Sequence, residues 1–380
     1  MSRIKILLVA VIFFAVTLNP FYSAYAQRQL SENAQISVLT CDTGNELYSL
    51  FGHTAIRIND PANGIDAVFN YGMFDFRTPN FYLKFIKGDL QYFVSTSSFE
   101  DFYADYLYNH RAVYEQQLNL TLVQKQKLFD ELVQVLSSQD RYYTYKFIDR
   151  NCTTMVVDRV NANINGHLSL KVKDSCLTNR RILYGYLSYH FYENLGINIM
   201  FGAKTDKDFY KLYLPLQFME SISISTNNGK PLTNATKIVN PKTEESAAFS
   251  LWNNWYTYVL FLLVVILINR RSIYLTWFIV MGALGVFLFA VGFYSLHEEL
   301  DLNYNILLFN PLFFVLVYFA LRDKLKWAVK MVYVCLAILL IYTIVLIPKV
   351  HFVMFLPIIL TNIILLGRML LKYKKALKGL

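Results

Sequence analysis

The stretch Asp149-Arg150-Asn151-Cys152-Thr153-Thr154 has the pattern of a helix start, and Leu50-Phe51-Gly52-His53-Thr54, far upstream, leads into a strand. A cysteine and a histidine that are distant in sequence but meet in a fold are the minimum set for thiol nucleophilic catalysis. We therefore take Cys152 as the candidate nucleophile and His53 as the candidate general base. The plainer alternative is a small buried cysteine and an ordinary polar histidine.

The surroundings of Cys152 favour a reactive thiol. The sequence predicts a helix over about 152–163, capped by Asn151 or Asp149. The free N–H groups and the dipole at a helix N-terminus favour a thiolate over a thiol. The same groups can stabilise the oxyanion of a tetrahedral intermediate, so Asn151 and Thr153 are candidate oxyanion or substrate-binding residues.

The surroundings of His53 predict a β-hairpin. Residues 54–59 alternate between apolar and polar, residues 61–64 form a turn, and residues 66–71 form the returning strand. A third polar group usually orients a catalytic histidine, and Asn70 on the returning strand is our candidate. Asp60 and Asp75 are weaker candidates for the same role.

The two ends of the chain predict export and membrane insertion. Residues 1–26 have the charged, apolar and Ala-Tyr-Ala segments of a secretory signal peptide. Five apolar segments follow residue 253, and most are long enough to cross the hydrocarbon core of a bilayer. We place them at about 254–269, 272–294, 304–321, 325–348 and 351–371. Residues 27–222 then form an exported catalytic domain, 223–253 a linker, and 254–380 a transmembrane domain of about five helices.

The charges between the apolar segments predict the topology. Basic residues follow the first, third and fifth segments, whereas the second turn carries Glu298, Glu299 and Asp301. The positive-inside rule therefore places residues 27–253 outside the cytoplasm and the C-terminus inside it. Because much of the net charge of +9 lies beside these segments, it does not predict a nucleic-acid partner.

The cysteines leave two questions open. Cys41, Cys152 and Cys176 all lie in the exported domain, where disulfides form in many bacteria. A Cys41–Cys176 disulfide is possible and would leave Cys152 free, but the sequence alone does not establish it. Cys335 lies within an apolar segment. Among the exported cysteines and histidines no short ligand spacing occurs, so we predict neither a metal site nor a cofactor.

The order of the motifs, histidine before cysteine, resembles the circularly permuted branch of the papain-like NlpC/P60 thiol enzymes. The Asn-Cys pair at a helix start also resembles the lecithin:retinol acyltransferase group. More closely, residues 50–57, 69–72 and 149–154 are similar to the DUF4105 family of Bacteroidota. Members with a following membrane segment resemble the Lnb family of lipoprotein N-acyltransferases. The resemblance implies an α+β exported domain of permuted papain-like (NlpC/P60) type, followed by an all-α transmembrane domain.

The outer turn after the second apolar segment carries His297, Asn303 and Asn305, and the segment that follows begins with a stretch that ends in Asn310-Pro311. This stretch resembles a His-then-Asn pattern of the same family, so His297, Asn303 and Asn305 are candidates for contact with a lipid headgroup. A solvated loop in which Asn310-Pro311 kinks a helix is an equal alternative.

The family resemblance implies a thiol-dependent acyltransferase of the bacterial inner membrane, with its N-terminal domain in the periplasm. The acyl chain would pass from a membrane phospholipid, through a Cys152 thioester, to the N-terminal amine of a diacylated lipoprotein. Two alternatives remain open. One is a membrane-anchored cysteine peptidase or amidase of the cell envelope, and the other is a non-catalytic envelope sensor or scaffold.

Overall fold

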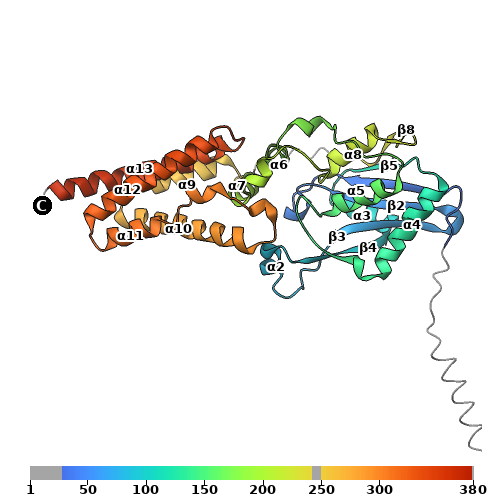
Figure 1. Ribbon diagram of the computed structural model, residues 1–380, viewed down its shortest axis with the longest axis horizontal. Coiled ribbons are helices and arrows are strands. Elements are labelled where there is room, and N and C mark those ends of the chain that lie inside the picture. The colour runs from blue at the N-terminus through green and yellow to red at the C-terminus, as the bar shows by residue number, and fades with distance from the viewer. Residues whose placement is uncertain (1–27, 242–249, 379–380) are drawn as a thin grey trace, which may run out of the picture.

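The computed structural model describes residues 28–241 and 250–378. The predicted signal peptide lies outside the described residues. Figure 1 shows an elongated molecule with a sheet domain at one end and a bundle of long helices at the other. The exported domain and the membrane domain expected from the sequence are therefore separate bodies that meet at one junction.

The exported domain is built on a seven-stranded sheet in the order β6-β4-β3-β2-β1-β5-β9, and every neighbouring pair is antiparallel. The predicted hairpin is confirmed as β2 and β3, with Ala55 opposite Asn70. The strands are β1 (Gln35–Cys41), β2 (His53–Asp60), β3 (Ile65–Met73), β4 (Gln91–Ser98), β5 (Val113–Gln117), β6 (Tyr142–Thr144) and β9 (Thr236–Asn240).

Helices cover both faces of this sheet. One face packs Ile36, Ile56 and Phe69 against α4 (Leu122–Ser137) and α5 (Cys152–Asn163) in the main core. The other face packs Leu39 and Val68 against α3 (Phe99–Tyr108). The remaining helices of the domain are α2 (Phe81–Lys87), α6 (Asn179–Tyr186), α7 (Phe191–Met200) and α8 (Pro215–Ile224). The structure is thus α+β with an antiparallel sheet.

The linker predicted over 223–253 is wrong for most of its length. The small hairpin β7 (Thr226–Asn227) and β8 (Lys230–Pro231) and then the edge strand β9 all fall inside it. Because an edge strand exposes much of its surface to solvent, its polar composition resembles that of a linker. The folded domain therefore extends to at least Asn240.

The membrane domain holds five helices in the described residues, near the five predicted positions. They are α9 (Trp255–Leu267), α10 (Arg271–Tyr294), α11 (Phe313–Leu321), α12 (Leu325–Leu346) and α13 (Phe352–Lys378). Only α10, α12 and α13 are long and apolar enough to cross a membrane by length and composition, and α9 is a shorter apolar helix. The domain of about five helices is therefore present, and its first and third helices are shorter than the predicted segments.

The third predicted span is the clearest correction. Residues Tyr304–Leu307 form a 3-10 turn, and the α-helix begins only at Phe313, after Asn310-Pro311. The resulting helix has nine residues, and such a helix rises only about 14 Å. The polar residues at the start of this segment are used to build a folded turn at the outer end of the bundle.

Contacts at the two ends of the bundle agree with the predicted topology. At the junction, Leu296 N donates to Lys87 O of the sheet domain at 2.7 Å, and Lys349 pairs with Asp206 at 3.1 Å. At the far end, Arg271 pairs with Asp323 at 3.0 Å. The acidic outer turn therefore lies against the exported domain, and the basic turns lie at the opposite, cytoplasmic end.

We expect Gly285→Ala to destabilise the membrane domain. A Cβ at Gly285 on α10 would overlap the carbonyl oxygen of Phe309. Overpacking of this kind should lower the free energy of unfolding by about 1–3 kcal/mol. Thermal unfolding of the full chain in detergent measures the effect. Gly367→Ala on α13 is the matched control, since its Cβ would meet nothing within 4 Å; an equal loss in both variants would contradict the packing argument.

Candidate active site

Cys152 is the first residue of α5, and the helix start is held by a reciprocal capping box. Asn151 Oδ1 accepts the backbone N–H of Thr154 at 2.9 Å, and Thr154 Oγ1 accepts that of Asn151 at 2.8 Å. Asn151 Nδ2 donates to the carbonyls of Phe147 at 2.7 Å and Tyr213 at 2.9 Å. Both amide hydrogens of Asn151 are therefore in use, so this side chain positions the helix and has no donor left for an oxyanion.

Thr153 fastens the same helix start to the strand that carries His53. Its side chain is fully buried, and its hydroxyl lies 3.1 Å from that of Thr54 on β2. The Thr153 hydroxyl also lies 3.9 Å from Cys152 Sγ. With the side chain of Asn151 engaged, oxyanion stabilisation would fall to the backbone N–H groups of the first turn, which an α-helix leaves without partners inside the helix.

His53 is the first residue of β2, and its ring contacts Asn70 on β3. Nε2 of His53 lies 3.2 Å from Oδ1 of Asn70. If Nε2–H donates to this oxygen, Nδ1 is the nitrogen that can accept a proton. The two weaker candidates are engaged elsewhere: Asp60 accepts hydrogen bonds from Ser31, and Asp75 pairs with Arg77.

A glycine allows β3 to lie directly against the candidate nucleophile. Gly72 has a φ of +85°, and a Cβ built there would lie 3.1 Å from Cys152 Cβ. A larger residue would combine backbone strain with a close contact. Gly72 thus brings the end of β3 to the same point as the start of α5.

The electrostatic surroundings lower the pKa of Cys152. Burial raises this pKa, but the charge of the His53 ring, the backbone N–H of Thr54 and the Thr153 hydroxyl outweigh burial and lower it. Cys152 and His53 are nevertheless not joined by a hydrogen bond of normal geometry in the described structure. Catalytic hydrogen bonds are often long without substrate and tighten only when it binds.

The four cysteines are all free in the structure, so the possible Cys41–Cys176 disulfide is not formed. Cys41 is buried in β1, and burial raises its pKa to about 12. Cys176 is exposed, and Cys335 is buried within α12. Of the two buried or partly buried cysteines of the sheet domain, only Cys152 has its pKa lowered.

Comparison with known protein families agrees with this division of the chain. Residues 10–185 match the Lnb N-terminal periplasmic domain, and residues 251–376 match the Lnb transmembrane domain. The chain belongs to the Lnb family. Lnb proteins form an acyltransferase family, and membership implies lipoprotein N-acylation, a periplasmic N-terminal domain and multiple transmembrane helices. No curated protein and no solved structure matches the chain closely enough for a comparison.

The outer-turn residues of this Lnb chain join its two domains. Asn303 Nδ2 donates to the carbonyls of Ile199 and Met200, both at 2.8 Å, and Asn305 Nδ2 donates to that of Asn198 at 2.8 Å. Both asparagines are buried and satisfy the C-terminal carbonyls of α7. This geometry favours a docking role for Asn303 and Asn305 over contact with a headgroup.

His297 lies in the same junction. Its Nε2 is 3.0 Å from the carbonyl oxygen of Phe85 on α2, and its ring packs edge-on against that of Phe85. Burial lowers the pKa of His297, so the ring is neutral over a wider pH range than an exposed histidine. A neutral, buried ring is a weak partner for a phosphate.

Glu299 is the junction residue that sequence reasoning missed. Its side chain is 1 % exposed, and Oε1 accepts the backbone N–H of Ile148 at 2.9 Å. Next to it, Lys204 bridges Asp149 at 2.5 Å and Glu298 at 2.7 Å. The segment before α5, which contains Ile148 and Asp149, is thus held to the outer turn of the membrane domain by a hydrogen bond and a bridging lysine. In the sequence, only the adjacent pair Glu298-Glu299 could have pointed to this contact. The same pair is equally typical of an exposed acidic turn.

We expect Glu299→Ala to slow Cys152 chemistry. Removal of the carboxylate leaves the buried N–H of Ile148 unpaired, at a cost of about 1–3 kcal/mol. If that cost displaces the start of α5, the rate of Cys152 alkylation should fall by about tenfold. Glu298→Ala is the matched control, because that side chain is 66 % exposed and its ion pair should contribute little. Equal rates in the two variants would exclude positioning by Glu299.

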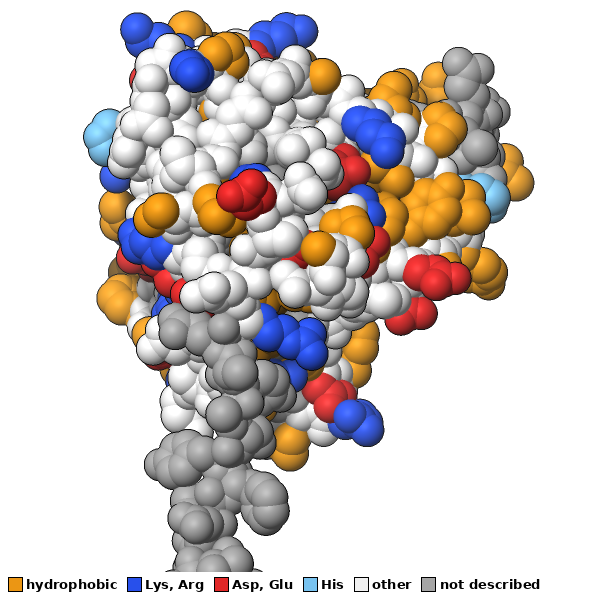
Figure 2. Space-filling model, turned by 90° about the vertical axis from the view of Figure 1, so that its right-hand side faces the viewer, with side chains coloured by type: hydrophobic (Ala, Val, Ile, Leu, Met, Phe, Trp, Pro, Cys, Tyr) orange, Lys and Arg blue, Asp and Glu red, His pale blue; other side chains and the backbone are white. Residues whose placement is uncertain are grey.

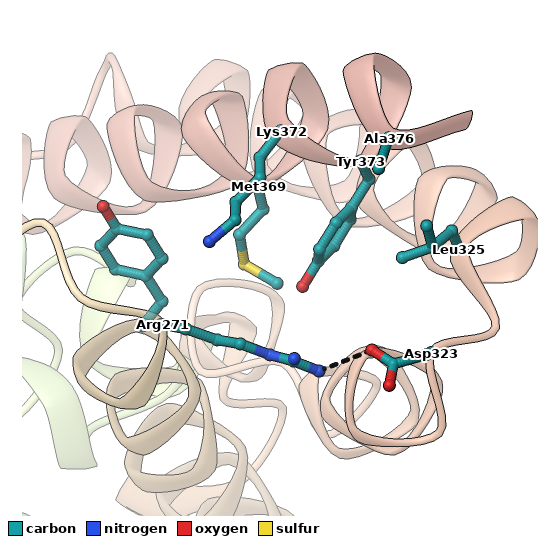
Figure 3. A pocket seen from close by; sticks show the side chains of 8 residues that line it. Arg271, Asp323, Leu325, Met369, Lys372, Tyr373 and Ala376 are labelled. Atoms are coloured by element: carbon teal, nitrogen blue, oxygen red, sulfur yellow. Dashed lines mark hydrogen bonds and ion pairs between the residues drawn. The ribbon is translucent and has the colours of Figure 1, made fainter. Parts of the chain in front are cut away.

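Two pockets lie at the end of the helix bundle that is opposite the sheet domain. Their volumes are about 190 and 300 Å³, and both are lined by Arg271, Tyr274 and Lys372. Figure 3 shows the first pocket, with Arg271 reaching to Asp323 below the helix that carries Lys372. Because this is the cytoplasmic end, these pockets are separated from Cys152 by the membrane and take no part in the candidate site.

Proposed function

We propose that this protein is a lipoprotein N-acyltransferase in which Cys152 is the nucleophile and His53 the general base. The single observation that carries the assignment of the site is the position of Cys152: it opens α5, its pKa is lowered, and His53 is among the groups that lower it. Family membership supports the reaction class, since Lnb proteins are acyltransferases.

In the first step, the Cys152 thiolate attacks the ester carbonyl of a membrane phospholipid. A bond forms between Sγ and the acyl carbon, and the carbonyl electrons move onto oxygen beside the first-turn N–H groups of α5. The ester C–O bond then breaks, and the protonated His53 gives its proton to the departing lysophospholipid. The product is a thioester between Cys152 and the acyl chain.

In the second step, the free α-amine of the lipidated N-terminal cysteine of a diacylated lipoprotein attacks the thioester. His53 takes a proton from this amine, the C–S bond breaks, and Cys152 returns as a thiolate. Asn70 holds the His53 ring through Nε2 during both steps. The reaction converts an ester into an amide through a thioester and consumes no nucleotide.

The membrane domain supplies proximity. The donor phospholipid and the lipid-anchored acceptor protein are both confined to the outer leaflet. A domain docked on the outer ends of the helices therefore meets them at high effective concentration. The placing of Cys152 at a helix start and of His53 at the start of a sheet strand also supports a papain-like relationship of permuted NlpC/P60 type. We propose that relationship from motif order and site geometry.

Mass spectrometry of a lipoprotein's N-terminal lipopeptide tests the proposal. A Gram-negative host depleted of its own N-acyltransferase would carry either this protein or an empty vector. We expect a third acyl chain only when the protein is present. Diacylated peptide in both cases, with the protein shown to be inserted and folded, would overturn the proposal. Release of free fatty acid instead would indicate that water is the acceptor and favour a hydrolase.

A further inference from the structure

A row of neighbouring aromatic rings lies on the sheet domain near its junction with the membrane domain. Successive ring centroids lie 6.3 Å apart from Tyr48 to Phe74, 5.0 Å from Phe74 to Phe76, 4.9 Å from Phe76 to Phe81 and 5.4 Å from Phe81 to Tyr82. We call these five residues the aromatic track. It draws on the loop before β2, the end of β3, and α2.

Much of the track faces outward. Tyr48 is 65 % exposed, Phe76 61 % and Tyr82 73 %, and Leu83 beside them is 68 % exposed. An exposed cluster of large apolar side chains of this kind marks a surface that binds an apolar partner. Figure 2 views the opposite end of the sheet domain, where basic and acidic side chains are spread over the surface and a separate group of hydrophobic side chains gathers at the right-hand side.

One end of the track lies at the membrane surface. Ser295 Oγ at the outer end of α10 donates to the carbonyl of Ile86 on α2 at 2.7 Å, and Lys87 lies 5.9 Å from the centre of the Tyr294 ring. Phe293, one residue earlier on α10, is 80 % exposed. Aromatic side chains at the end of a membrane helix mark the headgroup level, so α2 lies where the outer leaflet begins (Figure 1).

Phe74, next to the last ring at the other end of the track, lies two residues from the glycine that meets the candidate nucleophile. That glycine is Gly72, which abuts Cys152. The Phe74 ring also lies 5.3 Å from that of Tyr92. The Tyr92 ring in turn lies 6.4 Å from that of Tyr143, whose hydroxyl would lie 3.8 Å from a Cβ built at Gly72, the same Cβ that meets Cys152.

We propose that the aromatic track binds the acyl chain of the donor phospholipid and leads it from the outer leaflet to Cys152. The occupant is a long acyl chain because the track is built of aromatic rings and α2, at one of its ends, is hydrogen-bonded to the outer end of the membrane helix α10. A phospholipid whose acyl chain lies on the track can hold its ester carbonyl near α2, at the level of the headgroups. When the lipid moves along the track, the ester carbonyl reaches the Cys152 thiol. The inference rests on the proposed function for the reaction, but binding can be tested without turnover.

Photocrosslinking tests the binding. The full-length protein and its Cys152→Ala form would be placed in vesicles of phosphatidylethanolamine carrying a diazirine midway along one acyl chain. We expect label on Tyr48, Phe74 or Phe76 in both forms. Label on α2 alone would mean that this helix merely touches the bilayer. Label confined to α2 and the membrane helices would therefore overturn the proposal, whatever the fate of the reaction.

A substrate comparison tests the consequence for catalysis. In Tyr82→Ser/Leu83→Ser, the ratio of kcat/KM for a long-chain phospholipid to that for a dibutyryl phospholipid should fall about tenfold, because two apolar contacts with the long chain are lost. The control Leu122→Ser/Val123→Ser removes exposed apolar side chains at the start of α4 and should leave the ratio unchanged. An unchanged ratio in the track variant would overturn the proposal. If the wild-type protein is inactive on both donors, the result contradicts the proposed function itself.

Discussion

Cys152→Ala is expected to abolish N-acylation, with a loss of about 10³-fold or more, since no other group can form the thioester. Cys152→Ser should be almost as inactive, because a serine hydroxyl is a much weaker acid than a thiol and forms the attacking anion far less readily. Lipopeptide mass spectrometry gives the transfer product. Intact-protein mass spectrometry of the wild type, with donor lipid but no lipoprotein, should show an acyl adduct that neutral hydroxylamine removes.

The matched control for Cys152 is Cys176→Ala. Cys176 is an exposed free thiol of the same domain, so its removal tests whether any accessible cysteine can serve. We expect full transfer in this variant. Substantial transfer by a folded, inserted Cys152→Ala protein would show that the nucleophile is elsewhere and would leave the lowered pKa of Cys152 without a catalytic meaning.

His53→Ala is expected to lower transfer by about 10²–10⁴-fold, the range for loss of a general base. It should also move the pH dependence of Cys152 alkylation. His53 lowers the pKa of Cys152, whereas burial raises it, so loss of the ring leaves burial dominant and the pKa rises. The thiolate then forms only at higher pH, and alkylation by iodoacetamide at mildly acidic pH becomes slower than in the wild type.

The control for His53 is His167→Ala, which removes an exposed histidine of the same domain. Its alkylation profile should coincide with that of the wild type. Asn70→Ala should produce a smaller loss of transfer than His53→Ala, because the ring remains in place as a base but loses the partner that fixes its orientation. An alkylation midpoint unchanged in His53→Ala would separate the two residues and exclude their acting together.

Features encoded over a few neighbouring residues were predicted correctly. The cap at Asn151 and the start of α5 follow from a polar residue before an apolar-periodic run. The hairpin of β2 and β3 follows from alternating apolar and polar residues around a Pro-Ala-Asn-Gly turn. The membrane domain and its orientation follow from hydropathy and from basic turns. Each of these signals is local, so the sequence carries it before any tertiary contact forms.

Tertiary structure decided the features that join distant segments. β9 resembles a polar linker until it pairs with β5 at the edge of the sheet, and the outer turn resembles a headgroup site until Asn303 and Asn305 satisfy the end of α7. Glu299 reaches Ile148 across 151 positions of chain. No local pattern reports such a contact, because the burial that makes a lone carboxylate important arises only when the two domains dock.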